Sequence, residues 1–426
     1  MANKSYYFLN LGCPKNQTDG DNIRGALNGL GLTEAESPEI VDYIIVNTCA
    51  FIEDARLETQ GEIRELEEYK KNGARLIAVG CYPALSDIRK DIPAVDAAFR
   101  FNQVEELLSY VSGDKIGCHS PDQINRVVED LPYAYLVISD GCDNRCSYCS
   151  IPMIRGGYRS RPVMSILKEA EYLAKNGIKE LVLVAQDTAI YGNDIQGKPD
   201  LACLCRMLAG VGGIEWLRIM YAHPAHLSED LLDKLFAIDK VCRYLDMPIQ
   251  HISPNMLSRM KRQCGPAKIK QLINHLRKID NDISLRTTLM VGFPGEADDD
   301  FKALLDFIEE TKFDHLGAFT YSPEANTAAE DLDNRVEPEL AGERYEMLYD
   351  VAEDISSQKA EAQKGIRQKL LIERESLEGG GYMEARSYRQ APEIDGFYRI
   401  PEKRGMKIGQ FIEALIKDVD QAEYEV

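Results

Sequence analysis

The sequence lacks any long hydrophobic run, and it has fewer basic than acidic residues. No apolar stretch approaches the ~18 residues that a membrane span needs, and the opening MANKSYYFLN lacks the basic-then-apolar layout of a signal peptide. Lysine and arginine number 50 against 70 aspartates and glutamates, which gives a net charge of −20. We therefore expect a cytoplasmic protein with no membrane contact, and one not built as a general binder of polyanions.

The length and composition are those of an ordinary globular protein with several domains. The chain has 426 residues, of which 44% are hydrophobic and 28% charged. It carries eleven cysteines. In a reducing compartment such thiols more often bind metal or react than form disulfides. The cysteines are therefore the first place to look for chemistry.

The first part of the chain predicts a parallel α/β sheet. Continuous apolar runs at residues 6–12, 42–48 and 75–80 suit strands buried on both faces, and helical segments separate them, one of which should stop at Gly73. Cys13, Cys49 and Cys81 each follow one of these runs. Since ligands bind outside the carboxyl ends of parallel strands, we expect the three cysteines to meet at one edge of the sheet.

The alternation restarts after a polar linker and predicts a partial (β/α) barrel of the TIM type, followed by a small antiparallel β-barrel. Candidate strands of the partial barrel are residues 134–139, 180–186, 216–222, 244–250, 285–293 and 316–322, and an acidic helix at 338–364 closes it. Four short β-like runs follow, at 367–375, 381–389, 395–401 and 410–419. We expect domains at 1–118, 134–363 and 364–426, with a linker at 119–133.

Several other residues could be assigned functional roles, but a structural role is the simpler interpretation for each. We expect the five scattered cysteines to be buried or incidental free thiols: Cys118, Cys203, Cys205, Cys242 and Cys264. The C-terminal aromatic residues Tyr382, Tyr388, Phe397 and Tyr398 should belong to a barrel core. The acidic stretch 296–300 is typical of a helix N-terminus. Polar or capping roles are expected near strand ends for His223, His226 and His251.

A tight cysteine triplet carries the strongest chemical signal. Cys142, Cys146 and Cys149 lie in SDGCDNRCSYCSIP, at the end of the first barrel strand. A structural zinc site needs a fourth ligand, and no fourth Cys or His is near, so zinc remains the weaker alternative. Three thiolates on a 4Fe–4S cluster leave one iron open. The spacing, with Tyr148 before the last cysteine, resembles the signature of the radical S-adenosylmethionine (SAM) superfamily.

This resemblance implies that the open iron binds the amino and carboxylate groups of SAM. The reduced cluster would then break the C5′–S bond and form a 5′-deoxyadenosyl radical, while the barrel orients the reactants. Gln186 and Asp187 occupy the position where the superfamily contacts the SAM amino group. Gly292, in VGFPGE, occupies the position beside the adenine and ribose. A plain loop or turn role is the alternative for all three.

The remaining cysteines extend the resemblance to the whole chain. LGCPKN around Cys13, VNTCAF around Cys49 and VGCYP around Cys81, followed by the triplet and a small β-domain like a TRAM module, resemble the methylthiotransferases. In that family the N-terminal cysteines hold a second 4Fe–4S cluster whose open iron binds the sulfur. The resemblance thus implies two 4Fe–4S clusters, with SAM serving both as methyl donor and as radical source.

Two branches of this family differ in their substrate. GCPKN, QDT (186–188) and APEIDG (391–396) look like the branch that modifies the β-carbon of an aspartate in ribosomal protein twelve of the small subunit. Asp19-Gly20-Asp21 departs from the Asp-Ser-Glu expected there. An acidic enzyme would attract a basic ribosomal protein, and the C-terminal 63 residues carry 12 acidic against 11 basic groups, few for RNA binding.

Two alternatives stay open beside this reading. One is a methylthiotransferase acting on isopentenyladenosine in tRNA, and the other is a zinc-bearing protein that binds RNA or ribosomes without catalysis. For the favoured reading we expect a flavodoxin-like electron donor and a monomeric enzyme.

Overall fold

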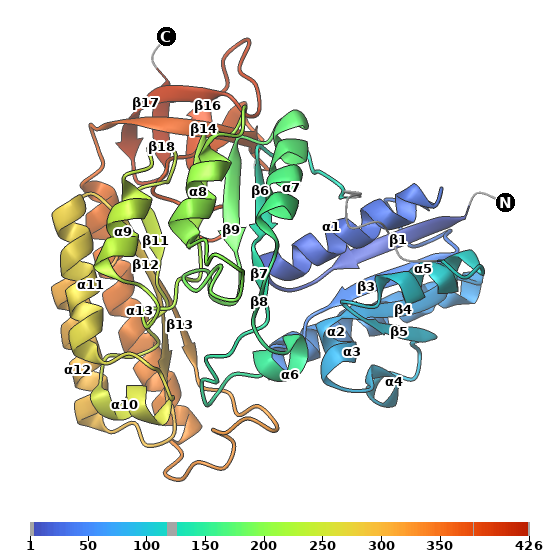
Figure 1. Ribbon diagram of the computed structural model, residues 1–426, viewed down its shortest axis with the longest axis horizontal. Helices are drawn as coiled ribbons and strands as arrows, with labels where there is room; N and C mark the ends of the chain where they lie inside the picture. The colour runs from blue at the N-terminus through green and yellow to red at the C-terminus, as the bar shows by residue number, and fades with distance from the viewer. Residues whose placement is uncertain (1–3, 117–125, 378, 425–426) are drawn as a thin grey trace. The chain divides into compact units, whose positions relative to one another are not determined.

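The computed structural model describes residues 4–116, 126–377 and 379–424, which form two compact units (Figure 1). The smaller unit comprises residues up to 129 together with 140–143 and 149–159, and the larger unit comprises the rest. The predicted linker at 119–133 lies outside the described residues as far as residue 125. Within the described ranges, no helix is long and apolar enough to cross a membrane.

A five-stranded parallel sheet forms the centre of the smaller unit, in the order β2–β1–β3–β4–β5. Its strands are β1 (Ser5–Asn10), β2 (Thr33–Glu34), β3 (Tyr43–Thr48), β4 (Arg75–Gly80) and β5 (Ala97–Arg100). The three predicted strands are therefore confirmed as β1, β3 and β4. The sequence did not predict β2 and β5, because runs of two to four residues are too short to show a period.

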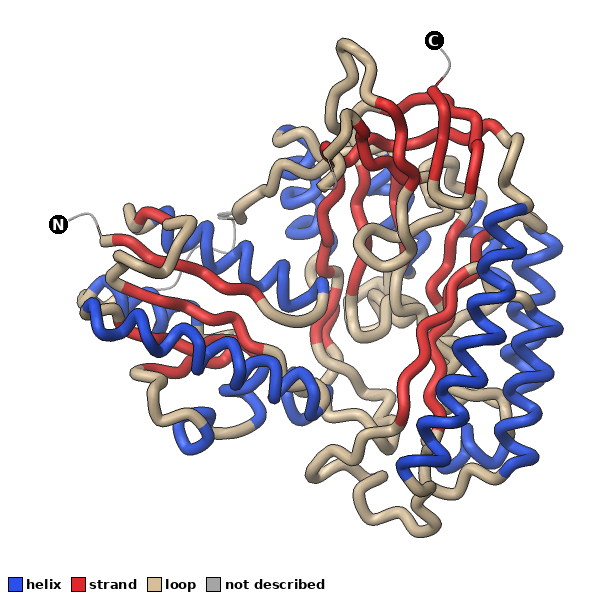
Figure 2. Tube along the Cα trace, turned by 180° about the vertical axis from the view of Figure 1, so that it is seen from behind, coloured by secondary structure: helices blue, strands red, loops and turns tan. Residues whose placement is uncertain are grey.

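Alternate residues of the central strands pack against opposite layers of helices. Every residue of β3 is buried. Ile44 belongs to one apolar core with Ile63 of α2 (Glu53–Leu66). Ile45 belongs to the other core, with Ile23 and Leu27 of α1 (Pro14–Gly29). Helices flank both faces of this sheet (Figure 2). A strand buried on both sides must be apolar throughout, which is the pattern that the sequence shows.

The helices of the smaller unit connect these strands. They are α1 (Pro14–Gly29), α2 (Glu53–Leu66), the 3-10 helix η1 (Glu67–Asn72), α3 (Cys81–Leu85), α4 (Ile88–Asp91), α5 (Val104–Ser112) and α6 (Ile151–Arg155). The predicted stop at Gly73 is confirmed, since this residue adopts φ +94° directly after η1. Two short strands, β7 (Ser139–Asp140) and β8 (Arg159–Ser160), lie where the chain passes between the units.

The larger unit contains the predicted partial barrel. Its six strands form two parallel three-stranded sheets, β10–β9–β6 and β11–β12–β13, and a bridge between Leu217 and Val241 lies where one sheet succeeds the other. The strands are β6 (Tyr133–Val137), β9 (Glu180–Val184), β10 (Trp216–Ile219), β11 (Tyr244–Asp246), β12 (Ser284–Val291) and β13 (His315–Thr320). Each of the six predicted strands is present, and the barrel is open between β6 and β13.

Helices alternate with these strands, as a (β/α) architecture requires. They are α7 (Val163–Lys175), α8 (Leu201–Ala209), α9 (Glu229–Phe236), α10 (Pro254–Arg259), α11 (Pro266–Ile279), α12 (Asp298–Thr311) and α13 (Pro338–Glu361). The acidic closing helix predicted at 338–364 is α13. Asp298, Asp299 and Asp300 begin α12, so the predicted helix N-terminus is confirmed for these three residues.

The C-terminal residues form a small closed barrel in the order β14–β15–β16–β18–β17. Its strands are β14 (Arg367–Glu375), β15 (Tyr382–Arg386), β16 (Tyr398–Pro401), β17 (Phe411–Asp418) and β18 (Gln421–Tyr424). The predicted barrel is present, but β18 was not predicted and the β16–β18 pair is parallel. A closed ring with an odd number of strands cannot alternate direction throughout, so one parallel pair is unavoidable.

The loop between β15 and β16 packs this barrel against the strands of the same unit. Glu393 accepts hydrogen bonds from the hydroxyls of Tyr133 and Tyr135, at 3.0 and 2.9 Å. Asp395 accepts one from Tyr244 at 2.6 Å and pairs with Arg286 at 2.5 Å. The APEIDG stretch therefore has a structural role in joining the two barrels.

The expectation for the C-terminal aromatic residues needs correction, whereas the described scattered cysteines are free thiols as expected. Tyr398 is buried in the C-terminal barrel and Tyr388 is half-buried, but Tyr382 and Phe397 are 42% and 37% exposed. These last two are not core residues, because Tyr382 begins a strand with its side chain outward and Phe397 lies in a loop. Among the scattered cysteines, Cys205, Cys242 and Cys264 are buried and Cys203 is half-buried, while Cys118 lies outside the described residues.

Candidate metal centres

The three spaced cysteines of the smaller unit meet at one edge of its sheet. Cys49 follows β3 and Cys81 follows β4 directly, and the preceding residues Thr48 and Gly80 are partners in the parallel register. Cys13 lies at the start of α1, three residues beyond the end of the neighbouring β1. Because β1, β3 and β4 are adjacent and parallel, the structure brings these cysteines together as expected.

Electrostatic coupling between the thiols reflects this closeness. Burial raises the pKa of the Cys81 thiol to about 11, against the opposing effect of Arg155, and the sulfurs of Cys13 and Cys49 raise it further. Burial also raises the pKa of Cys49, although the backbone N–H groups after it oppose this effect. The two buried thiols are therefore protonated at neutral pH unless a metal displaces their protons.

Small and polar residues shape the loops around these thiols. Gly12 has φ +90°, and a Cβ added there would lie 2.7 Å from Cys49 Cβ and 2.9 Å from its Sγ. The fully buried Asn16 donates to the carbonyls of Leu11 and Thr48, at 2.6 and 3.2 Å. Its Oδ1 lies 3.8 Å from Cys81 Sγ. Asn16 thus ties together the three loops that carry the cysteines.

The donor set suits a polynuclear cluster better than a zinc ion. Tetrahedral zinc, with Zn–S near 2.3 Å, would hold its sulfurs about 3.8 Å apart. Within the described part of the chain, the sulfurs of Cys13, Cys49 and Cys81 are not all within 4.8 Å of one another. Several irons bridged by sulfide can span such a wider arrangement of three thiolates.

The cysteine triplet lies in a loop whose intervening polar side chains are buried. Asn144, Ser147 and Ser150 are 8% or less exposed, whereas Cys142, Cys146 and Cys149 are all half-exposed. Ser147 donates to the carbonyl of Arg259 at 2.8 Å, and its own N–H donates to that of Met260 at 3.0 Å. The loop is thereby anchored through its non-cysteine residues, while each of its three cysteines is partly exposed.

The two polar residues after β9, Gln186 and Asp187, differ in how far their side-chain oxygens are already hydrogen-bonded. Asp187 is 1% exposed and accepts hydrogen bonds from Asn144 Nδ2 at 2.9 Å and from the backbone N–H of Ala189 at 3.1 Å. The carboxylate therefore holds the triplet loop through Asn144. Gln186 Oε1, by contrast, is buried and has no hydrogen-bond partner among the residues that the structure describes. An unpaired buried acceptor fits a ligand that brings a donor, such as the amino group of SAM.

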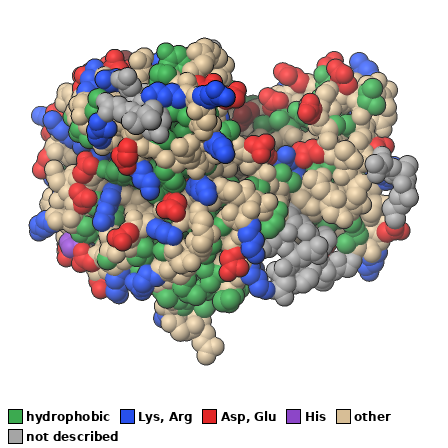
Figure 3. Space-filling model, turned by 90° about the horizontal axis from the view of Figure 1, so that it is seen from above, with side chains coloured by type: hydrophobic (Ala, Val, Ile, Leu, Met, Phe, Trp, Pro, Cys, Tyr) green, Lys and Arg blue, Asp and Glu red, His purple; other side chains and the backbone are tan. Residues whose placement is uncertain are grey.

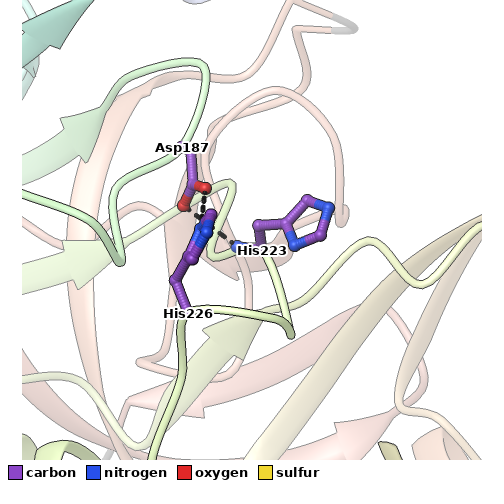
Figure 4. A group of neighbouring side chains, drawn as sticks. All are labelled: Asp187, His223 and His226. Carbon is purple, nitrogen blue, oxygen red and sulfur yellow. Dashed lines mark hydrogen bonds and ion pairs between the residues drawn. The ribbon is translucent and has the colours of Figure 1, made fainter. Parts of the chain in front are cut away.

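Asp187 also forms a cluster with two histidines (Figure 4). Ligand atoms of Asp187, His223 and His226 lie within 4.8 Å of one another, the donor set of a His₂-carboxylate metal site. However, His226 Nδ1 already bonds Asp187 at 2.6 Å, and His223 Nδ1 accepts the N–H of Ala225 at 3.1 Å. Figure 4 shows the His223 ring turned away from the carboxylate. The group is a hydrogen-bonded cluster, in line with the polar roles expected for these histidines.

An arginine that the sequence analysis did not identify, Arg262, contacts the cysteine triplet. Arg262 Nη1 lies 3.5 Å from Cys146 Sγ and 3.5 Å from the Tyr148 hydroxyl. The Tyr148 ring meets Phe293 edge-on, with centroids 6.3 Å apart, in an apolar cluster with Met256 and Met260. Tyr148 therefore supports the loop by packing.

Gly292 and Glu296 have clear structural roles. A Cβ on Gly292, which has φ +73°, would lie 2.6 Å from Ala341 Cβ, so this glycine allows α13 to approach. Glu296 accepts from the N–H of Gly292 at 2.8 Å and pairs with Arg344 at 2.8 Å. His251 Nε2 lies 3.2 Å from Glu296. Glu296 thus belongs to a buried polar group rather than to the helix N-terminus expected for the whole stretch.

The unexpected Asp19-Gly20-Asp21 sequence is accommodated by ion pairs and a tight contact. Asp19 pairs with Arg155 at 2.6 Å, and Asp21 pairs with Arg126 at 3.0 Å. A Cβ on Gly20 would lie 2.4 Å from Asn10 Oδ1. Asn16, Asn144, Arg155 and Arg262 are the site residues that pattern reasoning missed. For Asn16, Asn144 and Arg155, the only signal in the sequence is that they lie close to the cysteine motifs. Arg262 lies far from these motifs in sequence and has no such signal.

Family models match three segments of the chain. The Radical SAM superfamily matches residues 136–308, the uncharacterized protein family UPF0004 matches 5–99, and the TRAM domain matches 365–424. These segments hold the cysteine triplet, the N-terminal sheet and the C-terminal barrel respectively.

Two relatives match nearly the whole chain. The ribosomal protein uS12 methylthiotransferase RimO of Lachnoclostridium phytofermentans is 37% identical, over 97% of this chain and 98% of that protein. The corresponding protein of Syntrophus aciditrophicus is 40% identical, over 93% of this chain and 92% of that protein.

A solved structure shares the fold. The radical SAM methyltransferase TsrM from Kitasatospora setae, solved with cobalamin and a [4Fe-4S] cluster, matches with a TM-score of 0.58 at 16% identity. The match covers 96% of this chain and 84% of that one.

Proposed function

The chain belongs to the RimO family of ribosomal protein uS12 methylthiotransferases, and we propose that it transfers a methylthio group to the β-carbon of an aspartate in that ribosomal protein. The observation that carries this proposal is the meeting of Cys13, Cys49 and Cys81 at one sheet edge, in a chain that also bears the cysteine triplet. The triplet alone would fit any radical SAM enzyme. A second trio adds a place for a sulfur donor.

Each trio holds one 4Fe–4S cluster in this proposal, with Cys142, Cys146 and Cys149 on the first and Cys13, Cys49 and Cys81 on the second. When bound, the clusters and SAM supply radical abstraction of hydrogen and a sulfur atom for methylation. The chain's own residues supply the ligands and their support. Asn144 and Ser147 anchor the first loop, and Asn16 fastens the loops of the second.

The residues after β9 divide the work of binding SAM. Gln186 offers its unpaired, buried Oε1 to the amino group of SAM. Asp187, whose oxygens already have several partners, acts as a positioning residue for the triplet loop. The contacts of Tyr148 and Gly292 favour packing roles beside the cofactor over direct hydrogen bonds to it.

Charge supports a protein substrate. At a net charge of −20, the enzyme attracts basic ribosomal proteins and repels RNA phosphates. On the face drawn in Figure 3, basic and acidic side chains are intermingled over the larger unit. A ribosomal substrate places the reaction in the cytoplasm, and we expect a monomeric enzyme with a flavodoxin-like electron donor. The exposed Tyr382 and Phe397 are the observation that keeps tRNA in the comparison, since aromatic rings can stack on bases.

The test is anaerobic reconstitution followed by product analysis. The intact chain should bind about eight iron atoms with equivalent sulfide. Replacing the Cys142 triplet by alanine should leave about four irons and abolish SAM cleavage. Replacing the Cys13 trio should also leave about four but retain SAM cleavage, with methylthio transfer lost. Cys203→Ala, a half-buried cysteine outside both trios, is the matched control and should change neither.

The substrate is decided by offering uS12 and bulk tRNA side by side and measuring the mass of each. Modification of uS12 alone supports the proposal, and modification of tRNA alone refutes its substrate. Zinc without sulfide in the purified protein would refute the enzyme assignment as a whole.

A further inference from the structure

Arg155 belongs in sequence to the triplet segment, but its side chain serves the other cysteine trio. It is the last residue of α6, six positions after Cys149. The preceding residue, Ile154, packs into the apolar core of the smaller unit, among Ala50, Cys81 and Tyr82. This packing carries the arginine into that unit, where it is 8% exposed.

The guanidinium is held from three sides. Its Nη1 pairs with Asp19 at 2.6 Å, and its Cζ lies over the Phe101 ring, 4.0 Å from the ring centroid. Its Nη2 donates to Cys81 Sγ at 3.3 Å. Asp19 and Phe101 therefore fix the group in place, and one N–H is aimed at the sulfur.

The ionisation state of Cys81, which accepts the hydrogen bond, determines how strongly Arg155 interacts with it. Burying a guanidinium costs stability unless each charge is offset and each donor is satisfied. A neutral thiol is a weak acceptor, whereas a thiolate bound to iron is an anion that accepts a charge-assisted hydrogen bond. Asp19 and Asp140 offset the charges of Arg155 and of a second buried cation, Lys15, which lies 3.1 Å from Asp140 and 3.8 Å from Asp19. The N–H of Arg155 that points at Cys81 Sγ therefore has its best acceptor in an iron-bound thiolate.

We propose that Arg155 is a positioning residue for the N-terminal cluster that raises the reduction potential of this cluster through its hydrogen bond to Cys81. This inference rests on the proposed function, which puts a 4Fe–4S cluster on Cys13, Cys49 and Cys81. Adding one electron makes a cluster more negative. A cation and an N–H donor beside a ligand sulfur stabilise the reduced state over the oxidised one.

The test uses full-length protein in which Cys142, Cys146 and Cys149 are alanine, so that only the N-terminal cluster is present. After anaerobic reconstitution, the midpoint potential is measured by a redox titration followed by electron paramagnetic resonance. Arg155→Gln removes the charge, and Arg155→Lys keeps it but loses the fork that reaches both Asp19 and Cys81. Arg24→Gln is the matched control, an arginine of α1 whose guanidinium pairs with carboxylates of Glu34 and Asp21.

In Arg155→Gln, we expect the ratio of reduced to oxidised cluster at a fixed potential to fall at least tenfold. This fall corresponds to a midpoint potential lower by about 59 mV for one electron. The midpoint potential should decrease by less in Arg155→Lys, and in Arg24→Gln it should equal that of the parent protein. An unchanged midpoint in both Arg155 variants overturns the inference. If Arg155→Gln does not retain iron, Arg155→Lys decides alone. A parent protein that binds no cluster would overturn the proposed function, and the inference with it.

Discussion

A buried ion-pair network joins the first residue of β9 to the C-terminal barrel, and Glu180 is its centre. One carboxylate oxygen accepts from Arg218 Nε at 2.6 Å, and the other accepts from Arg386 Nη2 at 2.7 Å. All three side chains are at most 1% exposed. Arg386 also pairs with Glu373, so the network contains two cations and two anions. Glu180→Gln keeps the shape of the side chain and leaves one positive charge in excess.

The cost follows from the burial. Removing one partner of a buried ion pair typically costs about 3–5 kcal/mol. Arg218 retains the carbonyl of Tyr388 at 2.8 Å and the face of Tyr244, 4.6 Å from the ring centroid, so we take the lower end, about 3 kcal/mol. At roughly 2 °C per kcal/mol for a large domain, the melting temperature of the larger unit should fall by about 6 °C.

The effect should depend on pH in a defined direction. Burial by itself raises the pKa of Glu180, but the two guanidinium groups overcome it and hold that pKa below its usual 4.5. A carboxyl with a depressed folded-state pKa stabilises the protein above its unfolded pKa and loses that contribution as the pH falls through the folded one. The difference between the wild type and Glu180→Gln should therefore be full at pH 7 and shrink below about pH 4.5.

The single tryptophan provides the assay. Trp216 is 7% exposed in β10, and its ring meets that of Phe411 in β17 at 4.8 Å, so its fluorescence reports on the junction that Glu180 stabilises. Urea unfolding followed at this residue should show the loss in Glu180→Gln. Lys234→Ala, which breaks an exposed pair with Asp230 in the same unit, should leave the midpoint unchanged. Equal midpoints for these two variants would refute the reasoning.

Two further predictions concern the cysteine loops and the pH response of the partial barrel. Gly12→Ala should lower the amount of iron bound by the N-terminal trio, because the added Cβ would overlap Cys49. Gly73→Ala, at a similar φ and with no described atom within 4 Å of the added Cβ, should only reduce stability. Equal iron content in the two variants would contradict this prediction. Burial raises the pKa of Asp246 to about 6 from 3.8, so its folded form binds the proton more tightly. The wild type should lose about 1 kcal/mol of stability between pH 5 and pH 8 that Asp246→Asn does not lose, and parallel pH profiles would contradict this.

Local patterns predicted the features that depend on local geometry. Strands buried on both faces are apolar throughout, so β1, β3 and β4 and all six barrel strands were visible as runs. Because parallel strands end at one edge, the positions of Cys49 and Cys81 after two such runs were enough to predict that they meet. The short strands β2 and β5 and the last strand β18 escaped, since so few residues carry no period.

The amino-acid sequence alone was enough to predict the two cysteine trios, because cysteine spacing and strand ends are properties of neighbouring residues. Only the tertiary structure decided what surrounds them. Arg155 reaches Cys81 across 74 positions, and Arg386 reaches Glu180 across 206. No local pattern predicts such pairs, because contacts between polar side chains that are far apart in sequence leave no periodic signal. The same separation explains why Tyr382 and Phe397, indistinguishable in sequence from the buried Tyr398, proved to be exposed.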